Sequence, residues 1–125
     1  MAYSKEFCSR YGAYDNSGLL LDCKNEVKAA VFALDLSKDA VKAAEKSGAG
    51  AIVTHHPSIY SKLASLSADD ETSGAVLAAA RAGISVISMH LNLDAAEGGI
   101  DESLARAVRA AGGKAAGKAA ERCGE

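Results

Sequence analysis

The chain has 125 residues, of which 49% are hydrophobic, and a formal net charge of −2. This length predicts a single domain over residues 1–125, and the hydrophobic content is typical of a folded chain rather than a disordered one. The slightly acidic balance argues against a nucleic-acid partner, and no apolar run approaches the roughly 18 residues of a membrane span. Three cysteines without a CxxC spacing indicate free thiols, and together with a polar N-terminus they predict a cytoplasmic protein.

The first elements that the sequence predicts are two strands and a helix. Residues 19–21 form a short strand after the turn signal "NSG", and the apolar-rich stretch 26–36 fits a buried strand. A helix follows, for which Ser37 is a suitable N-cap and Gly48 ends the pattern.

Two further strand and helix pairs complete the pattern. Residues 51–53 are β-branched or small and predict a second buried strand, and a helix follows at 71–83. Residues 84–88 predict a third such strand, followed by a loop over 91–99 and a helix at 100–112. This alternation is typical of an α/β fold, layered α/β/α with a mainly parallel sheet.

All three histidines of the chain come directly after predicted strands. His55 and His56 follow one strand and His90 follows another. Right-handed crossovers place the carboxyl ends of parallel strands along one edge of the sheet, which is where open sheets of this class bind ligands. The topology therefore brings the three histidines to one edge, provided that their two strands are neighbours.

The pair His55 and His56 precedes the only proline, Pro57. A residue before proline is held extended, so the strand ends here with both rings at the rim. Adjacent rings splay apart, which suits two metal ions side by side better than one ion held by both. Imidazole is the commonest metal ligand in proteins. The alternative is one buried, hydrogen-bonded histidine and one exposed histidine, without a metal.

His90 and Asp94 lie four residues apart in the segment "HLNLD". On a strand they would be about 13 Å apart, whereas in a helix or a curled loop they come close enough to share an ion. Asp94 could instead form an Asx turn or cap a helix. Together the four candidate ligands have the chemistry of a paired-metal centre. Mixed histidine and carboxylate ligation suits Zn, Fe, Mn, Co or Ni, with one or two ions per site.

Two glycines, Gly98 and Gly99, precede the last predicted helix. Their backbone N–H groups could bind an anion such as phosphate at the N-terminus of that helix. The alternative is that the glycines serve the turn alone.

Three blocks of sequence resemble the Nif-three-like family of GTP cyclohydrolase type-two homologues. They are "DNSGLL", "ALDLSKDAVKAAEKSGAGAIVTHHPSIY" and "SMHLNLDAAEGGIDESLA", in this order, and the similarity runs from about residue 7 to about residue 112. The resemblance covers the N-terminal half of the family and implies a layered α/β fold with a dinuclear metal centre. The ligands that it implies are His55, His56 and Asp94, with His90 at or beside the site.

The same resemblance implies an activity and an assembly. The activity is that of a metal-dependent hydrolase acting on a nucleotide or small phosphorylated molecule through metal-activated water, with His56 and Asp94 as catalytic residues. The alternative is a non-catalytic metal-binding protein with a regulatory or assembly role. The assembly is a ring-like homo-oligomer, commonly a hexamer. In relatives a second half supplies a further His and Glu, so here a metal pair would need carboxylates such as Glu97, water or a partner subunit.

Overall fold

The structure is a computed structural model and describes residues 14–110. The chain divides into two compact units, which we describe separately. We call Asn16–His90 the sheet unit; the described part of the other, the helical unit, is residues 14–15 and 91–110. The single domain over residues 1–125 stays a prediction. Residues 111–112 of the last predicted helix, together with Cys8 and Cys123, lie outside the described residues, whereas Cys23 is a free thiol as predicted.

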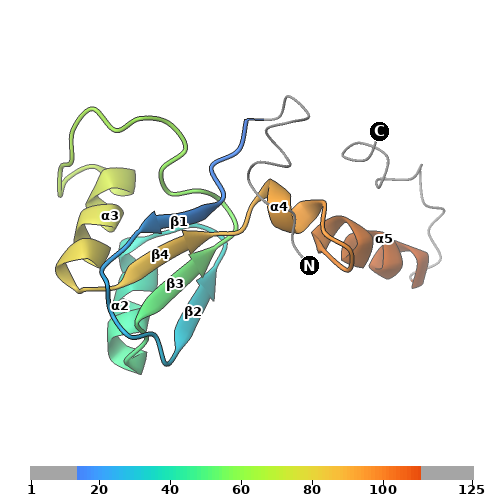
Figure 1. The fold of residues 1–125 in the computed structure, drawn as a ribbon, viewed down its shortest axis with the longest axis horizontal. Coiled ribbons are helices and arrows are strands. Elements are labelled where there is room, and N and C mark those ends of the chain that lie inside the picture. Colours follow the sequence, from blue (N-terminus) through green and yellow to red (C-terminus); the bar gives the residue numbers. More distant parts are fainter. Residues whose placement is uncertain (1–13, 111–125) are drawn as a thin grey trace. The chain divides into compact units, whose positions relative to one another are not determined.

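The sheet unit contains one four-stranded sheet (Figure 1). Its strands are β1 (Gly18–Leu21), β2 (Ala30–Ala33), β3 (Ala51–Thr54) and β4 (Ser85–Ser88), in the order β1-β4-β3-β2. The pairs β2–β3 and β3–β4 are parallel, and β1 is antiparallel to β4. The mainly parallel sheet that the alternation predicts is therefore confirmed.

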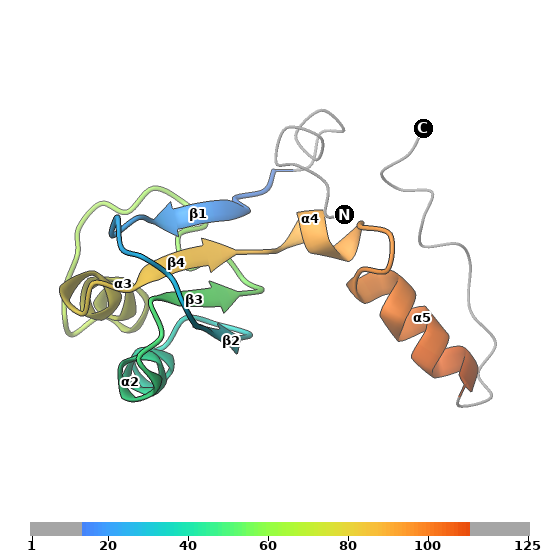
Figure 2. The same ribbon diagram turned by 60° about the horizontal axis from the view of Figure 1, so that its bottom comes forward.

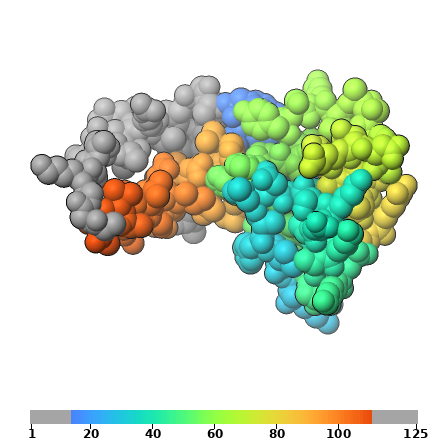
Figure 3. All heavy atoms as spheres, turned by 180° about the vertical axis from the view of Figure 1, so that it is seen from behind, coloured from blue at the N-terminus to red at the C-terminus, as the bar shows by residue number. Residues whose placement is uncertain are grey.

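Two helices make the crossovers of the parallel strands, α2 (Lys38–Ser47) after β2 and α3 (Glu71–Arg81) after β3. Ser37 caps α2 by accepting a hydrogen bond from the Ala40 N–H, and Gly48 ends the helix with a positive φ of 68°, as the sequence predicts. Both helices lie on one face of the sheet, where they pack against each other and against the strands (Figures 2 and 3). None of the helices between residues 14 and 110 has the length and apolarity that a membrane span requires.

The core lies between this pair of helices and the sheet. Ile52 and Val86 project from the central strands and are fully buried, and Val41, Ala44 and Ala79 meet them from the helices. Small alanines at the contact let the helices approach the sheet closely. This packing covers one face of the central strands β3 and β4.

The strand predicted over 26–36 is shorter and more exposed than the sequence indicates. Only Ala30–Ala33 pair as β2, because the partner strand β3 begins at Ala51, after Gly50. The strand lies at the edge of the sheet, and Phe32, on the face opposite the helices, is 78% exposed. The prediction of a buried strand is therefore wrong for this element.

The helical unit contains α4 (Leu91–Asp94) and α5 (Ile100–Ala110), so the loop predicted over 91–99 is wrong for its first four residues. The two glycines have a structural role in the turn between these helices. A Cβ on Gly99 would lie 2.1 Å from the Leu93 carbonyl oxygen. The Gly98 N–H donates to a carboxylate oxygen of Glu102 at 2.9 Å, and with the Arg106 guanidinium this bond holds the pKa of Glu102 below its ordinary value. The chain's own carboxylate thus takes the place predicted for an external anion.

Candidate metal centre

The carboxyl ends of β3 and β4 lie side by side and carry the histidines. Thr54 and Ser88 are register partners in the parallel pair, and the Met89 N–H donates to the Thr54 carbonyl at 2.8 Å. His55 follows the first strand and His90 lies two residues beyond the second. The expectation that the two strands are neighbours is confirmed, and the histidines meet at one edge of the sheet.

The three imidazole rings form a compact cluster within the sheet unit. The ring centroids of His55 and His56 are 5.0 Å apart, those of His55 and His90 are 5.2 Å apart, and those of His56 and His90 are 6.1 Å apart. The sequence led us to expect that the adjacent rings splay apart. They do not, because the chain leaves the extended conformation after Thr54. Two imidazoles that bind one tetrahedral zinc ion at about 2.0–2.1 Å hold their centroids about 5 Å apart. His55 and His90 therefore have the spacing of two histidines that share one ion, whereas His56 lies outside the group whose ligand atoms converge.

Two buried hydroxyl groups hold the main chain of the histidine pair. The Thr54 hydroxyl donates to the His56 carbonyl at 2.9 Å, and the Ser88 hydroxyl donates to the His55 carbonyl at 3.0 Å. Both hydroxyl residues are essentially inaccessible to solvent. Each central strand thus ends in a side chain that fixes the position of one histidine.

Hydrogen bonds also define which nitrogen is protonated in the rings of His55 and His56. The Nδ1 of His55 lies 2.9 Å from the Met89 carbonyl oxygen, and the Nδ1 of His56 lies 2.7 Å from a carboxylate oxygen of Asp35. Because a carbonyl and an ionised carboxylate only accept, each Nδ1 must carry the proton. In the neutral ring, Nε2 then keeps its lone pair, which is the form that binds a metal ion.

The burial of the pair also matches part of the alternative interpretation. His55 is half-buried and hydrogen-bonded, and His56 is exposed. A purely structural pair does not require a third imidazole at the same spacing, and His90 provides one. The main-chain N–H of His90 donates to the hydroxyl of the buried Ser17 at 3.3 Å, so the segment just before β1 also positions this histidine.

Asp94 is the last residue of α4 and belongs to the helical unit. It ends a helix, so it is not the helix N-cap that the alternative interpretation predicts. In the sheet unit, His55 and His90 each offer one ring nitrogen, and these two atoms lie within 4.8 Å of each other. Asp94 stays a predicted ligand.

A pocket of about 240 Å³ lies beside His56. Its lining combines carboxylates, hydroxyls and the histidine: Asp35, Leu36, His56, Pro57, Ser58, Glu71 and Thr72. The hydroxyl and the main-chain N–H of Ser73 hold the pKa of Asp70 below its ordinary value, and this N-cap fixes the first turn of α3 that borders the pocket.

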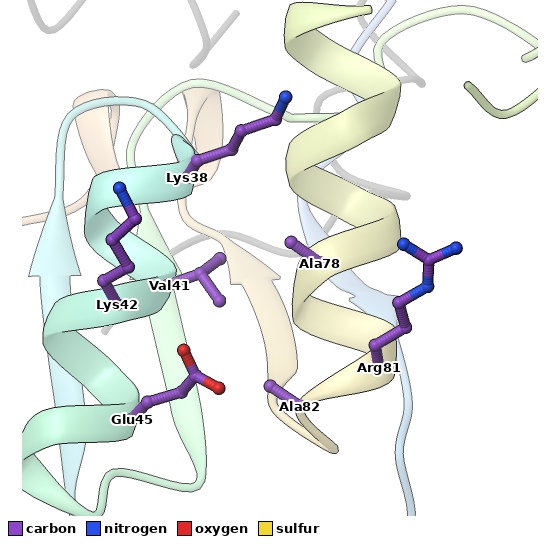
Figure 4. Close-up of a pocket in the computed structure, with 7 residues that line it drawn as sticks. All are labelled: Lys38, Val41, Lys42, Glu45, Ala78, Arg81 and Ala82. Atoms are coloured by element: carbon purple, nitrogen blue, oxygen red, sulfur yellow. The ribbon is translucent and has the colours of Figure 1, made fainter. Parts of the chain in front are cut away.

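A second hollow lies away from the histidines. It is a groove of about 370 Å³ between α2 and α3, lined by basic, acidic and apolar side chains (Figure 4): Lys38, Val41, Lys42, Glu45, Ala78, Arg81 and Ala82. It contains no histidine, and its only carboxylate is that of Glu45. The pocket beside His56 is therefore the one that a ligand of the metal centre would occupy.

Sequence reasoning did not single out Asp35, Thr54 and Ser88. Asp35 follows β2 just as His55 and His56 follow β3. The argument from strand ends that identified these histidines therefore also applies to Asp35. The roles of Thr54 and Ser88 depend on which carbonyl each hydroxyl reaches, and no pattern in the sequence reports that.

Comparison with known proteins places these residues in a family context. Residues 6–124 match the Duf34/NIF3 (NGG1p interacting factor 3) family. A GTP cyclohydrolase 1 type 2 homolog of Clostridium perfringens is 29% identical over 92 residues, which are 73% of this chain and 35% of that protein. Protein NIF3 homolog of Schizosaccharomyces pombe is 32% identical over 106 residues, which are 82% of this chain and 37% of that protein.

A solved structure supports the same relationship. The crystal structure of a Bacillus cereus protein related to NIF3 matches with a TM-score of 0.71 and 30% identity, over 82% of this chain and 30% of that chain. The predicted α/β fold class is thus confirmed. The chain spans about a third of the length of the curated relatives it matches.

Proposed function

Since the chain belongs to the Duf34/NIF3 family, we propose that it binds one or two divalent metal ions through His55, His56, His90 and Asp94. The observation that supports this proposal best is the cluster of three imidazoles with centroid separations of 5.0–6.1 Å. Nitrogen ligands with one carboxylate suit Zn, Mn, Fe, Co or Ni better than Ca.

Each candidate ligand has a defined part in this proposal. His55 and His90 present ring nitrogens from the ends of neighbouring strands, and their main chains are fixed by Ser88 and Ser17. Asp94 supplies the negative charge that offsets part of the charge of a cation. His56 lines the pocket of about 240 Å³ and is the ligand beside which a substrate would bind.

We propose further that the site hydrolyses a nucleotide or another small phosphorylated substrate. A divalent ion bound here would polarise a substrate oxygen and lower the pKa of water. The residues of the chain orient the substrate against the ion: His56 and Asp94 act at the reacting centre, and Thr72 offers a hydroxyl in the adjoining pocket. A homo-oligomeric assembly and a cytoplasmic location belong to the same proposal. The second candidate function is a metal-binding protein without catalysis, which requires the cluster but not the pocket.

The first experiment measures metal content and metal affinity of the purified chain. Wild type is expected to bind zinc or manganese stoichiometrically, and His55→Ala and His90→Ala are expected to lose most of that binding. Asp39→Asn, at an exposed carboxylate of α2, is the matched control and should bind as wild type does. A wild type with only traces of metal, unchanged in His55→Ala, contradicts the metal site.

The second experiment separates the two functions. Hydrolysis of GTP and of simple phosphoesters is measured with added manganese or zinc, for wild type and for the double variant His56→Ala, Asp94→Ala. Turnover that the double variant lacks supports the hydrolase. Stoichiometric metal binding with no turnover above that of the double variant leaves the non-catalytic function.

A further inference from the structure

We infer that Asp35 is a positioning residue for His56: its carboxylate fixes the ring with the proton on Nδ1, which leaves the lone pair of Nε2 available to a metal ion. This inference rests on the proposed metal site and assigns a role to a residue outside the four candidate ligands. It is argued from the backbone register, the contact itself and the exposure of the pair.

The register of the sheet places Asp35 beside His56. Ala33 pairs with Thr54 at the end of the β2–β3 ladder. The pairing of the two main chains continues past the strands, since the His55 N–H donates to the Ala33 carbonyl at 3.2 Å and the His56 N–H to the Leu34 carbonyl at 2.9 Å. Asp35 and His56 are therefore both two residues beyond paired positions on adjacent parallel chains.

The contact between the side chains is short and directional. The His56 Nδ1–H donates to Asp35 Oδ1 at 2.7 Å, within the range of charge-assisted hydrogen bonds. A carboxylate partner on one ring nitrogen fixes the tautomer and orientation of a histidine and makes its other nitrogen a stronger ligand. His55 has a main-chain carbonyl in the same role, so the two adjacent rings carry the proton on the same nitrogen but bind partners of different charge.

The exposure of the pair argues against a role in stability alone. The His56 side chain is 48% exposed and that of Asp35 is 64% exposed. Ion pairs in such surroundings are screened by water and contribute little to folding. Both residues also line the pocket of about 240 Å³, so the contact lies where a ligand of the centre would bind.

The first test reads the tautomer of His56 in the metal-free protein. Side-chain ¹⁵N NMR at about pH 8, where histidine is neutral, distinguishes a proton on Nδ1 from one on Nε2. We expect His56 to carry the proton on Nδ1 in wild type, and we expect Asp35→Ala to lose this preference. Asp35→Asn keeps an oxygen acceptor and should retain part of it, whereas Asp39→Ala, which removes an exposed carboxylate from α2, should retain all of it. A His56 that holds the Nε2 proton in wild type, or the same tautomer in Asp35→Ala, overturns the inference.

The second test is a double-mutant cycle on metal affinity. Asp35→Ala is expected to weaken the binding of zinc or cobalt about 10–100-fold, as loss of an outer partner of a ligating histidine does. In a His56→Ala background the same substitution should have no further effect, because the ring that it positions is absent. An unchanged affinity in Asp35→Ala overturns the inference and indicates that Asp35 has no role in metal binding. An equal loss of affinity in both backgrounds also overturns it and indicates that Asp35 binds the ion directly. If wild type binds no metal, both the proposed function and the positioning role are refuted. If wild type and Asp35→Ala bind metal equally well, only the positioning role is refuted.

Discussion

Replacement of Thr54 by valine tests whether the strand ends hold the histidine cluster. The Thr54 side chain is 1% exposed, and its hydroxyl donates to the His56 carbonyl at 2.9 Å. Valine keeps the branched shape but removes the donor of this part-buried hydrogen bond. Loss of one partner of a buried hydrogen bond costs about 1–2 kcal/mol. For a domain near this size, that loss corresponds to a fall in Tm of roughly 4–10 °C.

The functional consequence of Thr54→Val follows from the residue whose carbonyl is released. His56 should sample more positions, so metal affinity should fall several-fold together with Tm. Thermal unfolding followed by circular dichroism and a calorimetric zinc titration measure the two quantities. Thr54→Ser is the matched control, because it keeps the hydroxyl and should retain most of the affinity despite the lost methyl group. If Thr54→Val equals wild type in both Tm and affinity, this hydrogen bond does not position His56 and the reasoning is refuted.

Three further predictions concern the framework around the site. Ile52→Ala removes a fully buried core side chain and should lower the free energy of unfolding by about 3 kcal/mol in urea titrations; a loss below about 1 kcal/mol would contradict the packing. Gly99→Ala places a Cβ 2.1 Å from the Leu93 carbonyl oxygen, so helical circular dichroism and metal affinity should both fall, and wild-type values would contradict this turn. Because the pKa of Asp70 is lowered in the folded state, its cap stabilises the fold above the ordinary carboxyl pKa, and that stability is lost as pH falls through the folded pKa. Below about pH 4 the unfolding midpoint should therefore fall more steeply for wild type than for Asp70→Asn, and equal slopes would count against the cap.

The parts of the fold that the sequence predicts correctly depend on local physics. Ser37 caps α2 and Gly48 ends it because an N-cap hydroxyl and a left-handed glycine act on the nearest turn of the chain. The strand predicted at residues 51–53 is confirmed, because β-branched side chains bounded by Gly50 fit a buried strand. In each case the residues that determine the structure are neighbours in the sequence.

The predictions that failed involve distant partners. The strand register of β2 with β3 covers only Ala30–Ala33, so Val27 and Leu36 of the predicted strand lie outside it. The turn of helix at Leu91–Asp94 was predicted as a loop because four residues are too few to show a helical period.

The candidate site shows the same division between local and distant information. The histidines could be assigned to one sheet edge because each follows a strand and parallel strands end together. Asp35 also follows a strand, but only the register of β2 against β3 shows that it faces His56 rather than another residue of that edge. A strand shifted by one residue would turn the carboxylate to the opposite face of the sheet. The edge of the sheet can thus be identified from the sequence, whereas the hydrogen bond that orients His56 depends on a register that only the structure provides.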